Sequence, residues 1–254
     1  MPDNRSQCTV AEVALITGAA RRIGGEIARQ LHRAGFTIAL HYHTSVDQAQ
    51  TLADELCRER SDSCHLFQAD LESTTAVRQL AEDVLKRYDG LSLLVNNASD
   101  FSRALIDHCT EAQFDRLLDC NLKGPYFLIQ TLLPGLRRSS GCIVNILDIH
   151  VQRPLRHFSA YCAAKAGLDS LTRGLALELG PEVRVNGIAP GAILWPDSDE
   201  NYDEATRQKI LANTPLKRKG EPADIARTVQ FLACDAPFIT GDIITVDGGW
   251  SLAN

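Results

Sequence analysis

The fold is decided by residues 13–25, which read VALITGAARRIGG. Four apolar residues precede a turn that contains Gly18, and Ile23, Ile27 and Leu31 then recur every four residues. This order indicates a strand, a glycine turn and a helix. Glycine in such a turn lets backbone amides and the helix N-terminus approach a phosphate group. Two glycines alone are weak evidence for a nucleotide, because a tight turn without a ligand has the same pattern.

Strand and helix patterns alternate along the rest of the chain. Further apolar runs occur at residues 38–40, 64–67, 91–95, 143–146, 183–188 and 243–246, and segments with helical spacing separate them. Several runs are apolar on both faces, which is typical of parallel strands covered by helices on each side. We find no linker, charge block or repeat in the chain, and therefore predict a single doubly wound α/β domain over residues 1–254.

The composition is that of an ordinary globular protein of 254 residues, with 44% hydrophobic and 23% charged residues. A net charge of -6 argues against nucleic acid as a partner. No run reaches the roughly 18 apolar residues of a membrane span, and the N-terminus lacks an apolar signal-peptide core, so we expect a cytoplasmic protein without a membrane partner. The eight cysteines and seven histidines are scattered, and His41 and His43 lack a second ligand pair, so we predict no metal site.

The end of the second predicted strand bears on the cofactor. An NAD-binding sheet places Asp or Glu there, on the ribose hydroxyls. This sequence has His43, Thr44 and Ser45 instead, and two adjacent arginines, Arg21 and Arg22, stand in the glycine turn. Arginine forms charge-assisted hydrogen bonds with phosphate. The combination favours NADP(H) over NAD(H).

Tyr161 and Lys165 form a second candidate pair, one turn apart on the same helical face. A nearby ammonium stabilises the phenolate and lowers the tyrosine pKa, which suits proton transfer. A surface pair without a role has the same spacing. Here, however, the pair opens a helix after the strand at residues 143–146 and Asp148, at the sheet edge where such folds bind ligands.

The order and spacing of the motifs make the chain resemble the short-chain dehydrogenase/reductase family along nearly its whole length. The motifs are the glycine turn, Asp70-Leu71, Asn96-Asn97-Ala98, Asn121, Tyr161 with Lys165, and Pro190-Gly191. The resemblance implies a Rossmann-type domain with a seven-stranded, mostly parallel sheet and helices on both faces. It also implies a nicotinamide cofactor across the carboxyl ends of the strands and, as is common in the family, a homotetramer.

Roles for individual residues follow from the same resemblance. Tyr161 would donate a proton, Lys165 would bind the nicotinamide ribose and lower the pKa of Tyr161, and Asn121 would hold a water in a proton relay. Asp70 and Leu71 would flank the adenine. The full set implied for the cofactor is Gly18, Arg21, Arg22, Ile23, His43, Thr44, Ser45, Asp70, Leu71, Asn97, Ala98, Ser99, Tyr161, Lys165, Pro190 and Gly191.

Two departures from the common family pattern point to one branch. Arg22 stands at the middle glycine of the turn, and Asp148 stands where a serine usually polarises a substrate carbonyl. Both resemble the pteridine reductases, which reduce oxidised pterins, dihydropterins or dihydrofolate with NADPH. Asp148 would then join the catalytic group of Asn121, Tyr161 and Lys165. The implied substrate contacts are Arg22, Ser99, Phe101, Asp148, Tyr161 and Trp195, with Phe101 stacked on the pterin ring.

The chemistry of Asp148 supports the same branch independently. A ketone needs a neutral donor on its developing alkoxide, and a carboxylate would repel that charge. A C=N bond takes hydride at carbon while its nitrogen acquires a proton, and an aminopyrimidine offers donors to a carboxylate. Thr44 weakens the match, because the pteridine reductases carry an arginine there, and the preference for NADPH could be smaller than in that branch.

Residues 192–215 stand where the family has its substrate lid, and Trp195 would line the pocket. The acidic run at residues 197–204 is expected to be a solvated face that discourages an acidic acyl carrier protein. The alternatives are an NADPH-dependent reductase of 3-oxoacyl thioesters or other carbonyls and, less favoured, a non-catalytic NADP-binding sensor. Which pterin or folate is the physiological substrate stays open.

Overall fold

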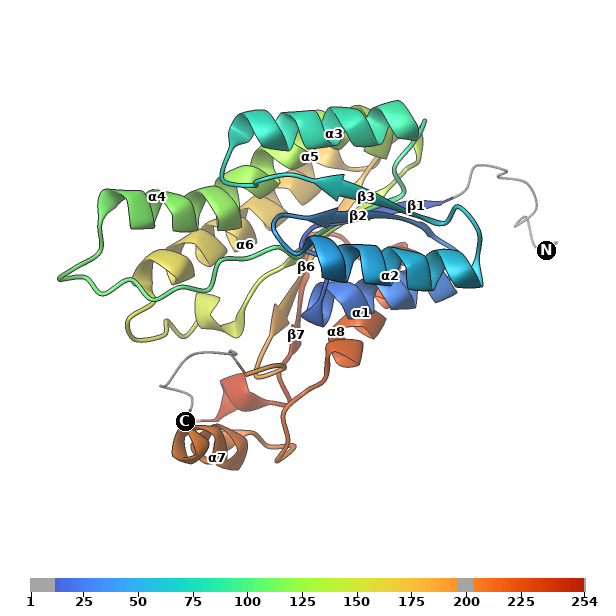
Figure 1. Cartoon of the computed structure of the whole chain (residues 1–254). Coiled ribbons are helices and arrows are strands. Elements are labelled where there is room, and N and C mark those ends of the chain that lie inside the picture. The colour runs from blue at the N-terminus through green and yellow to red at the C-terminus, as the bar shows by residue number, and fades with distance from the viewer. Residues whose placement is uncertain (1–11, 196–202, 254) are drawn as a thin grey trace.

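A seven-stranded parallel sheet forms the centre of the molecule in the computed structural model, which describes residues 12–195 and 203–253 (Figure 1). The strand order is β3-β2-β1-β4-β5-β6-β7, and every neighbouring pair is parallel. The strands are β1 (Val13–Ile16), β2 (Thr37–Tyr42), β3 (Cys64–Gln68), β4 (Leu93–Asn96), β5 (Cys142–Ile146), β6 (Arg184–Pro190) and β7 (Ile243–Val246). The predicted doubly wound α/β fold is confirmed.

Helices cover both faces of the sheet (Figure 1). Those of the first face are α1 (Arg22–Arg33), α2 (Val46–Glu59) and α8 (Pro222–Gln230), and those of the second are α3 (Thr74–Arg87), α5 (Gly124–Arg138) and α6 (Ser159–Leu179). Two further helices, α4 (Glu111–Leu118) and α7 (Glu204–Asn213), lie beyond the sheet, and α4 packs against α6.

Alternation along β4 shows why the strand is apolar on both faces. Leu93 and Val95 pack in the core beneath α1, α2 and α8, whereas Leu94 packs in the core beneath α3, α5 and α6. All three side chains are fully buried. A sheet covered on both sides therefore replaces the alternation of apolar and polar residues by a continuous apolar run.

Strand boundaries differ from the apolar runs where the first residues of a run bond to a helix instead of a strand. The amide of Val183 donates to the carbonyl of Leu179 (2.9 Å) and closes α6, so β6 begins only at Arg184. Leu91 is buried, but its amide donates to Gly135 O of α5 (3.2 Å), and β4 begins at Leu93. The apolar character of Val183 and Leu91 predicts that they are buried. The carbonyl to which each backbone amide donates decides whether the residue belongs to the strand.

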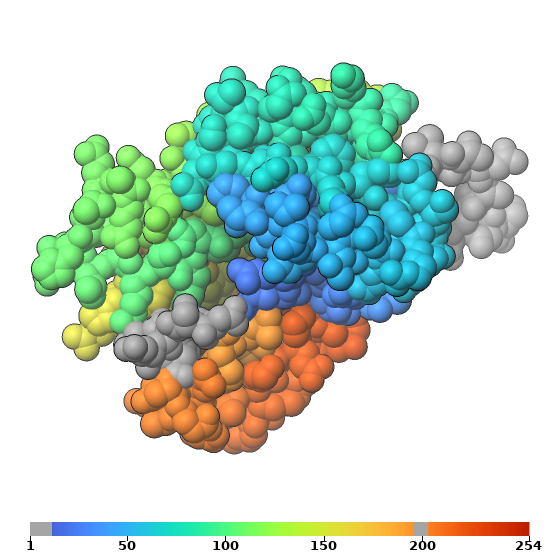
Figure 2. All heavy atoms as spheres, viewed as in Figure 1, coloured from blue at the N-terminus to red at the C-terminus, as the bar shows by residue number. Residues whose placement is uncertain are grey.

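Parallel pairing places all seven carboxyl ends at one edge of the sheet. The loops that follow β1, β2, β3, β4, β5 and β6 therefore meet at this edge, which is where doubly wound sheets bind ligands. Figure 1 shows α4 and α7 on the side of the molecule where this edge lies, and Figure 2 shows the same regions in green and orange. In the described ranges no helix is both long and apolar enough to cross a membrane.

The two helical leucines Leu128 and Leu177 give a matched test of the core. Leu128 on α5 is fully buried, whereas Leu177 on α6 is 86% exposed. We expect Leu128→Ala to lower the free energy of unfolding by about 2–5 kcal/mol, because it removes apolar contacts and leaves a cavity. Leu177→Ala should change it by less than about 0.5 kcal/mol. Urea titration followed by circular dichroism measures both, and equal losses would contradict this packing.

Candidate active site

Two adjoining cavities occupy the carboxyl edge of the sheet. The first has a volume of about 470 Å³ and lies over β1, β2 and the loops after β3 and β4. The second has a volume of about 480 Å³ and lies over the ends of β5 and β6. They share five lining residues, which are Arg21, Arg22, Ile23, Asn97 and Ser99. The arrangement therefore offers one elongated site with two compartments.

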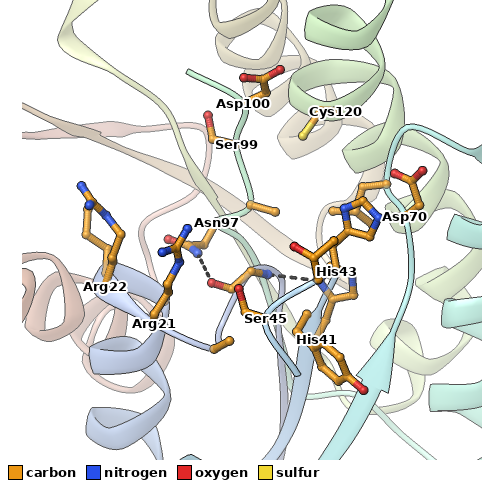
Figure 3. A pocket seen from close by; sticks show the side chains of 18 of the residues that line it. Arg21, Arg22, His41, His43, Ser45, Asp70, Asn97, Ser99, Asp100 and Cys120 are labelled. Atoms are coloured by element: carbon orange, nitrogen blue, oxygen red, sulfur yellow. Dashed lines mark hydrogen bonds between the residues drawn. The ribbon is translucent and has the colours of Figure 1, made fainter. Parts of the chain in front are cut away.

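Most residues predicted for the site line these cavities. In the first cavity these are Gly18, Arg21, Arg22, Ile23, His43, Thr44, Ser45, Asp70, Leu71, Asn97, Ala98 and Ser99. In the second they are Arg21, Arg22, Ile23, Asn97, Ser99, Phe101, Asp148, Tyr161, Lys165, Pro190, Gly191 and Trp195. Figure 3 shows Arg21, Arg22 and Asn97 at one side of the first cavity and His43 and Asp70 at the other. Asn121 is buried behind the site and lines neither cavity.

Close backbone approach shapes the glycine turn. Gly18 has a φ of +61°, and a Cβ there would lie 3.0 Å from the Cα of Ala98. A Cβ on Gly24, in the first turn of α1, would lie 2.3 Å from the carbonyl oxygen of Gly18. Both positions therefore require glycine, one because of its left-handed backbone and the other because the helix packs directly on the turn.

Arg22 occupies the left-handed region of the turn that most side chains avoid. Its φ is +56°, a conformation that costs a non-glycine residue on the order of 1–2 kcal/mol. Its Nη2 donates to the carbonyl oxygen of Trp195 (3.2 Å). Arg22 thereby connects the glycine turn after β1 to the segment after β6, over the junction of the two cavities.

The first cavity suits a dinucleotide. The first turn of α1 presents backbone amides that a helix leaves without internal partners, and Arg21 stands beside them. Acidic side chains gather instead at the other end of the cavity, where burial and the charge of Asp70 raise the pKa of Glu72. A cavity with cationic groups and amides at one end and hydrogen-bond acceptors at the other matches a phosphate linked to a base. No group of three or more metal-ligating side chains occurs among residues 12–195 and 203–253.

Tyr161 and Asp148 are directly hydrogen bonded at the second cavity. The hydroxyl of Tyr161 donates to Asp148 Oδ2 (2.7 Å), and Asp148 Oδ1 accepts the backbone amide of His150 (2.9 Å). Burial, followed by the charge of Asp148, raises the pKa of Tyr161 well above its usual value. The phenol is therefore held in its protonated form.

Lys165 does not act on Tyr161 as the sequence led us to expect. Its Nζ donates to the carbonyl oxygen of Ile146 (2.8 Å) and lies 5.9 Å from the centroid of the Tyr161 ring. Burial lowers the pKa of Lys165 to about 8. The expectation of a lowered tyrosine pKa was wrong for this structure, because burial of the phenol, and after it the Asp148 carboxylate bonded to the hydroxyl, raise the pKa of Tyr161.

Phe101 combines packing with exposure to the second cavity. Its ring stacks on Phe158, with centroids 4.5 Å apart, and meets Tyr161 edge to face at 4.9 Å. It also lines the cavity beside Asp148. Core packing and substrate contact are thus compatible at this residue, because Phe158 fixes the ring from behind.

Asn121 acts on the loop after β4. It lies in a single π-helical turn (Asp119–Lys123), a feature that often occurs near functional sites. Its Oδ1 accepts from Ser99 Oγ (2.7 Å), and its Nδ2 donates to the carbonyl oxygens of Asp100 and Leu117 (both 2.9 Å). The structure brings Asn121 to Ser99, so that it holds a residue shared by both cavities.

Several lining residues had no signal in the sequence. His150 and Trp250 meet edge to face with centroids 5.7 Å apart at the second cavity, although 100 positions separate them. Cys120 lines the first cavity, and burial raises the pKa of its thiol to about 11. Its place directly before Asn121 was the one available hint. His41 also lines the first cavity; the sequence offered it as part of the segment Leu40-His41-Tyr42-His43, which resembles the pteridine reductases, but gave it no role of its own.

The expected lid is described in part. Trp195 lines the second cavity, and the guanidinium of Arg207 on α7 lies 5.7 Å from the centroid of its ring. Residues 196–202, which carry most of the predicted acidic run, are outside the described residues. Of that run, Asp203 accepts the backbone amide of Thr206 (2.8 Å) and caps α7.

Comparison with known families agrees with this architecture. A family described as "Enoyl-(Acyl carrier protein) reductase" matches residues 18–251. The chain belongs to the short-chain dehydrogenase/reductase family, and it is an NAD(P)-dependent oxidoreductase of that family.

Two kinds of relative match the chain to a similar degree. It is 37% identical to the 3-oxoacyl-[acyl-carrier-protein] reductase FabG of Staphylococcus epidermidis over 239 residues, which are 93% of this chain and 97% of the relative. It is 34% identical to pteridine reductase 1 of Leishmania tarentolae, covering 95% of this chain and 97% of the relative. An uncharacterized oxidoreductase of Bacillus subtilis, YmfI, is 32% identical over 94% of the chain. Overall identity therefore leaves the branch open.

Gly24 and Gly174 provide a matched test of the turn. We expect Gly24→Ala to lower the free energy of unfolding by about 1–3 kcal/mol and to abolish tight nucleotide binding, because the new Cβ collides with the Gly18 carbonyl and with Asn97 Nδ2. At Gly174, inside α6, a Cβ would meet no atom within 4 Å, so Gly174→Ala should add about 0.5–1 kcal/mol through helix propensity. Thermal unfolding and nucleotide titration measure both. Normal nucleotide binding by Gly24→Ala would contradict the close approach.

Proposed function

We propose that this protein is an NADPH-dependent pteridine reductase. It reduces a dihydropterin, and related oxidised pterins or dihydrofolate, by hydride addition to a ring carbon and protonation of the adjacent ring nitrogen. The observation that carries the proposal is the 2.7 Å hydrogen bond from the Tyr161 hydroxyl to Asp148 at the wall of the second cavity.

Asp148 suits a C=N bond better than a ketone. During reduction of a 3-oxoacyl carbonyl, negative charge develops on oxygen, and a carboxylate within hydrogen-bond distance of the proton donor opposes it. Reduction of C=N places the new electron pair on nitrogen, which takes the proton of Tyr161. The carboxylate also accepts N–H groups of an aminopyrimidine through charge-assisted hydrogen bonds.

Tyr161 supplies the proton that the ring nitrogen of the substrate takes up. Tyr161 keeps its proton because its pKa is raised, so it is an acid rather than a base before turnover. Bound NADPH supplies the hydride. Lys165 would bind the nicotinamide ribose, and its position behind Tyr161, bonded to Ile146, keeps its ammonium beside the phenol when the proton leaves.

Phe101 supports a flat aromatic substrate. Its ring is held between Phe158 and Tyr161 and forms part of the cavity wall. A ring immobilised by its neighbours stacks on a pterin with little loss of side-chain entropy, and aromatic pairs add about 0.5–1.5 kcal/mol beyond their area burial. A flexible acyl chain gains less from such a surface.

The alternative is reduction of a 3-oxoacyl thioester or another carbonyl. Its support is the 37% identity to FabG of Staphylococcus epidermidis, against 34% to pteridine reductase 1 of Leishmania tarentolae. A difference of this size over the whole chain does not decide a substrate, because specificity resides in a few residues of the site. Asp148 is the residue at which the two functions make different demands.

NADPH is the proposed cofactor because of the charges in the first cavity. Arg21 and Arg22 line it, and the residues after β2 that also line it, His43, Thr44 and Ser45, include no acid. An acid at this position would repel the 2′-phosphate of NADPH. Hydroxyl groups of Thr44 and Ser45 are available to donate to phosphate oxygens.

We expect NADPH to be used more efficiently than NADH, and Arg21→Ala to reduce that preference. Loss of an arginine bond to phosphate should raise the KM for NADPH by about 10- to 150-fold, corresponding to about 1.5–3 kcal/mol. The KM for NADH is the internal control, because NADH lacks the extra phosphate. Steady-state kinetics with both cofactors measure this, and equal efficiency of the wild type with NADPH and NADH would refute the assignment.

The substrate class is tested by exchanging Asp148. Asp148→Ser should lower pterin reduction by about ten- to several-hundred-fold while reduction of an acetoacetyl thioester holds or rises. Asp148→Asn is the matched control, since it keeps the shape and the bond to the His150 amide while it removes the charge and replaces the acceptor for the Tyr161 hydroxyl by an amide donor.

Both activities are measured by NADPH oxidation with dihydrobiopterin, dihydromonapterin, dihydrofolate and acetoacetyl thioester. The proposal expects wild-type turnover of at least one pterin and a loss in both variants. A wild type that reduces the thioester and none of the pterins would establish the carbonyl alternative.

A further inference from the structure

His41 is a buried histidine that joins two loops of the cofactor cavity. It lies one residue before the end of β2 and is 2% exposed. Its Nδ1 accepts the backbone amide of Gly18 (3.1 Å), in the glycine turn after β1. Its Nε2 contacts the carbonyl oxygen of Ala69 (3.2 Å), in the loop after β3. Figure 3 shows the imidazole of His41 beside the turn, with a dashed line for the hydrogen bond between them.

These partners determine the tautomer of the ring. A backbone amide can only donate, so Nδ1 must be the acceptor, and a backbone carbonyl can only accept, so Nε2 must carry the hydrogen. Both nitrogens are used only when the ring is neutral. Burial lowers the pKa of His41 to about 4, so the neutral form persists across the ordinary pH range.

The bond to Gly18 stabilises a conformation that the cofactor site needs. Gly18 has a φ of +61°, its amide is bound by His41, and its carbonyl oxygen accepts from Asn97 Nδ2 (3.2 Å). The next amide, that of Ala19, donates to the carbonyl oxygen of His41 (2.8 Å). The turn is therefore held from both sides while its outer surface lines the cavity.

The bond to Ala69 acts at the other end of the same cavity. Ala69 directly precedes Asp70 and Leu71, which line it. Strand β2 lies between β1 and β3 in the sheet, so a single side chain on β2 reaches the loops of both neighbours. The bonds of His41 span the distance between the turn that faces the phosphates and the loop on the adenine side.

We propose that His41 is a positioning residue for the dinucleotide: its neutral imidazole sets the separation between the Gly18 turn and the Asp70-Leu71 loop. The proposal rests on dinucleotide binding at this turn and is independent of whether the substrate is a pterin. A chain in which the two loops move apart has a smaller fraction of binding-competent molecules, and the apparent Kd rises by the inverse of that fraction.

Substitution of His41 by a residue with an amide side chain removes one of its two hydrogen bonds and keeps the other. Asparagine places an oxygen near the position of Nδ1 and retains the acceptor for Gly18. Glutamine places an amide nitrogen near the position of Nε2 and retains the donor for Ala69. Leucine retains the bulk and neither bond. His41→Asn, His41→Gln and His41→Leu thus remove the Ala69 bond, the Gly18 bond, or both.

His32 supplies a matched control. It is also a buried histidine, at 3% exposure, and its Nε2 bonds to Ser63 Oγ (2.7 Å). It lies near the C-terminal end of α1 and lines neither the cofactor cavity nor the substrate cavity. His32→Leu should lower the melting temperature as a buried substitution does, without changing the affinity for nucleotide.

The experiment is titration of each purified variant with NADPH alone, followed by nucleotide fluorescence, with the melting temperature of the same sample. We expect His41→Leu to raise the Kd by about tenfold or more, with smaller increases for His41→Asn and His41→Gln, and none for His32→Leu. In turnover assays the loss should appear in the KM for NADPH and leave kcat at saturating NADPH nearly unchanged.

A purely structural His41 would lower the melting temperature of all three variants and leave the Kd of the folded protein unchanged, which would overturn the proposal. If His41→Leu does not fold, the test rests on His41→Asn and His41→Gln. Wild-type Kd values for NADPH in both of these variants would also overturn the proposal. A wild type that binds neither NADPH nor NADH would refute the cofactor assignment itself, and the positioning role with it.

Discussion

The side-chain amide of Asn97 joins the two loops on which the whole site is built. Its Nδ2 donates to the carbonyl oxygens of Thr17 (2.8 Å) and Gly18 (3.2 Å), and its backbone amide donates to Thr17 Oγ1 (2.9 Å). Strands β1 and β4 are neighbours in the middle of the sheet, so this clamp fixes the turn after β1 against the loop after β4. Gly24 packs within the same contact, which leaves no room for a side chain.

The two compartments of the site lie on either side of the loops that Asn97 joins. On one side the glycine turn, His41 and the Asp70-Leu71 loop enclose a cavity suited to a dinucleotide. On the other side the loop after β4 continues to Ser99 and Phe101, which Asn121 and Phe158 hold in place. Arg22 spans the junction and reaches Trp195. The two compartments therefore share loops that are joined by hydrogen bonds.

Asp148 places a carboxylate beside the phenol of Tyr161 at the wall of the second cavity. Burial and then the carboxylate 2.7 Å away raise the pKa of Tyr161, and the carboxylate adds an acceptor to the cavity. The same fold scaffold that would polarise a carbonyl with a neutral hydroxyl here offers a negative charge. Relatives of similar overall identity carry names for different substrates, and overall identity does not decide a substrate because specificity resides in a few residues of a site.

The amino-acid sequence by itself determined the class of fold, the order of strands and helices, and most of the residues around the two cavities. Those features depend on local patterns: apolar runs, a glycine turn, and motifs at the ends of strands. Contacts between distant segments carry no such pattern, and only the tertiary structure decided them. It placed Trp250 against His150, directed Asn121 to Ser99 and Lys165 to Ile146, and made His41 a bridge between two loops. The physical reason is that burial and hydrogen-bond partners, which set the pKa of Tyr161 and the tautomer of His41, exist only once the strands have assembled into the sheet.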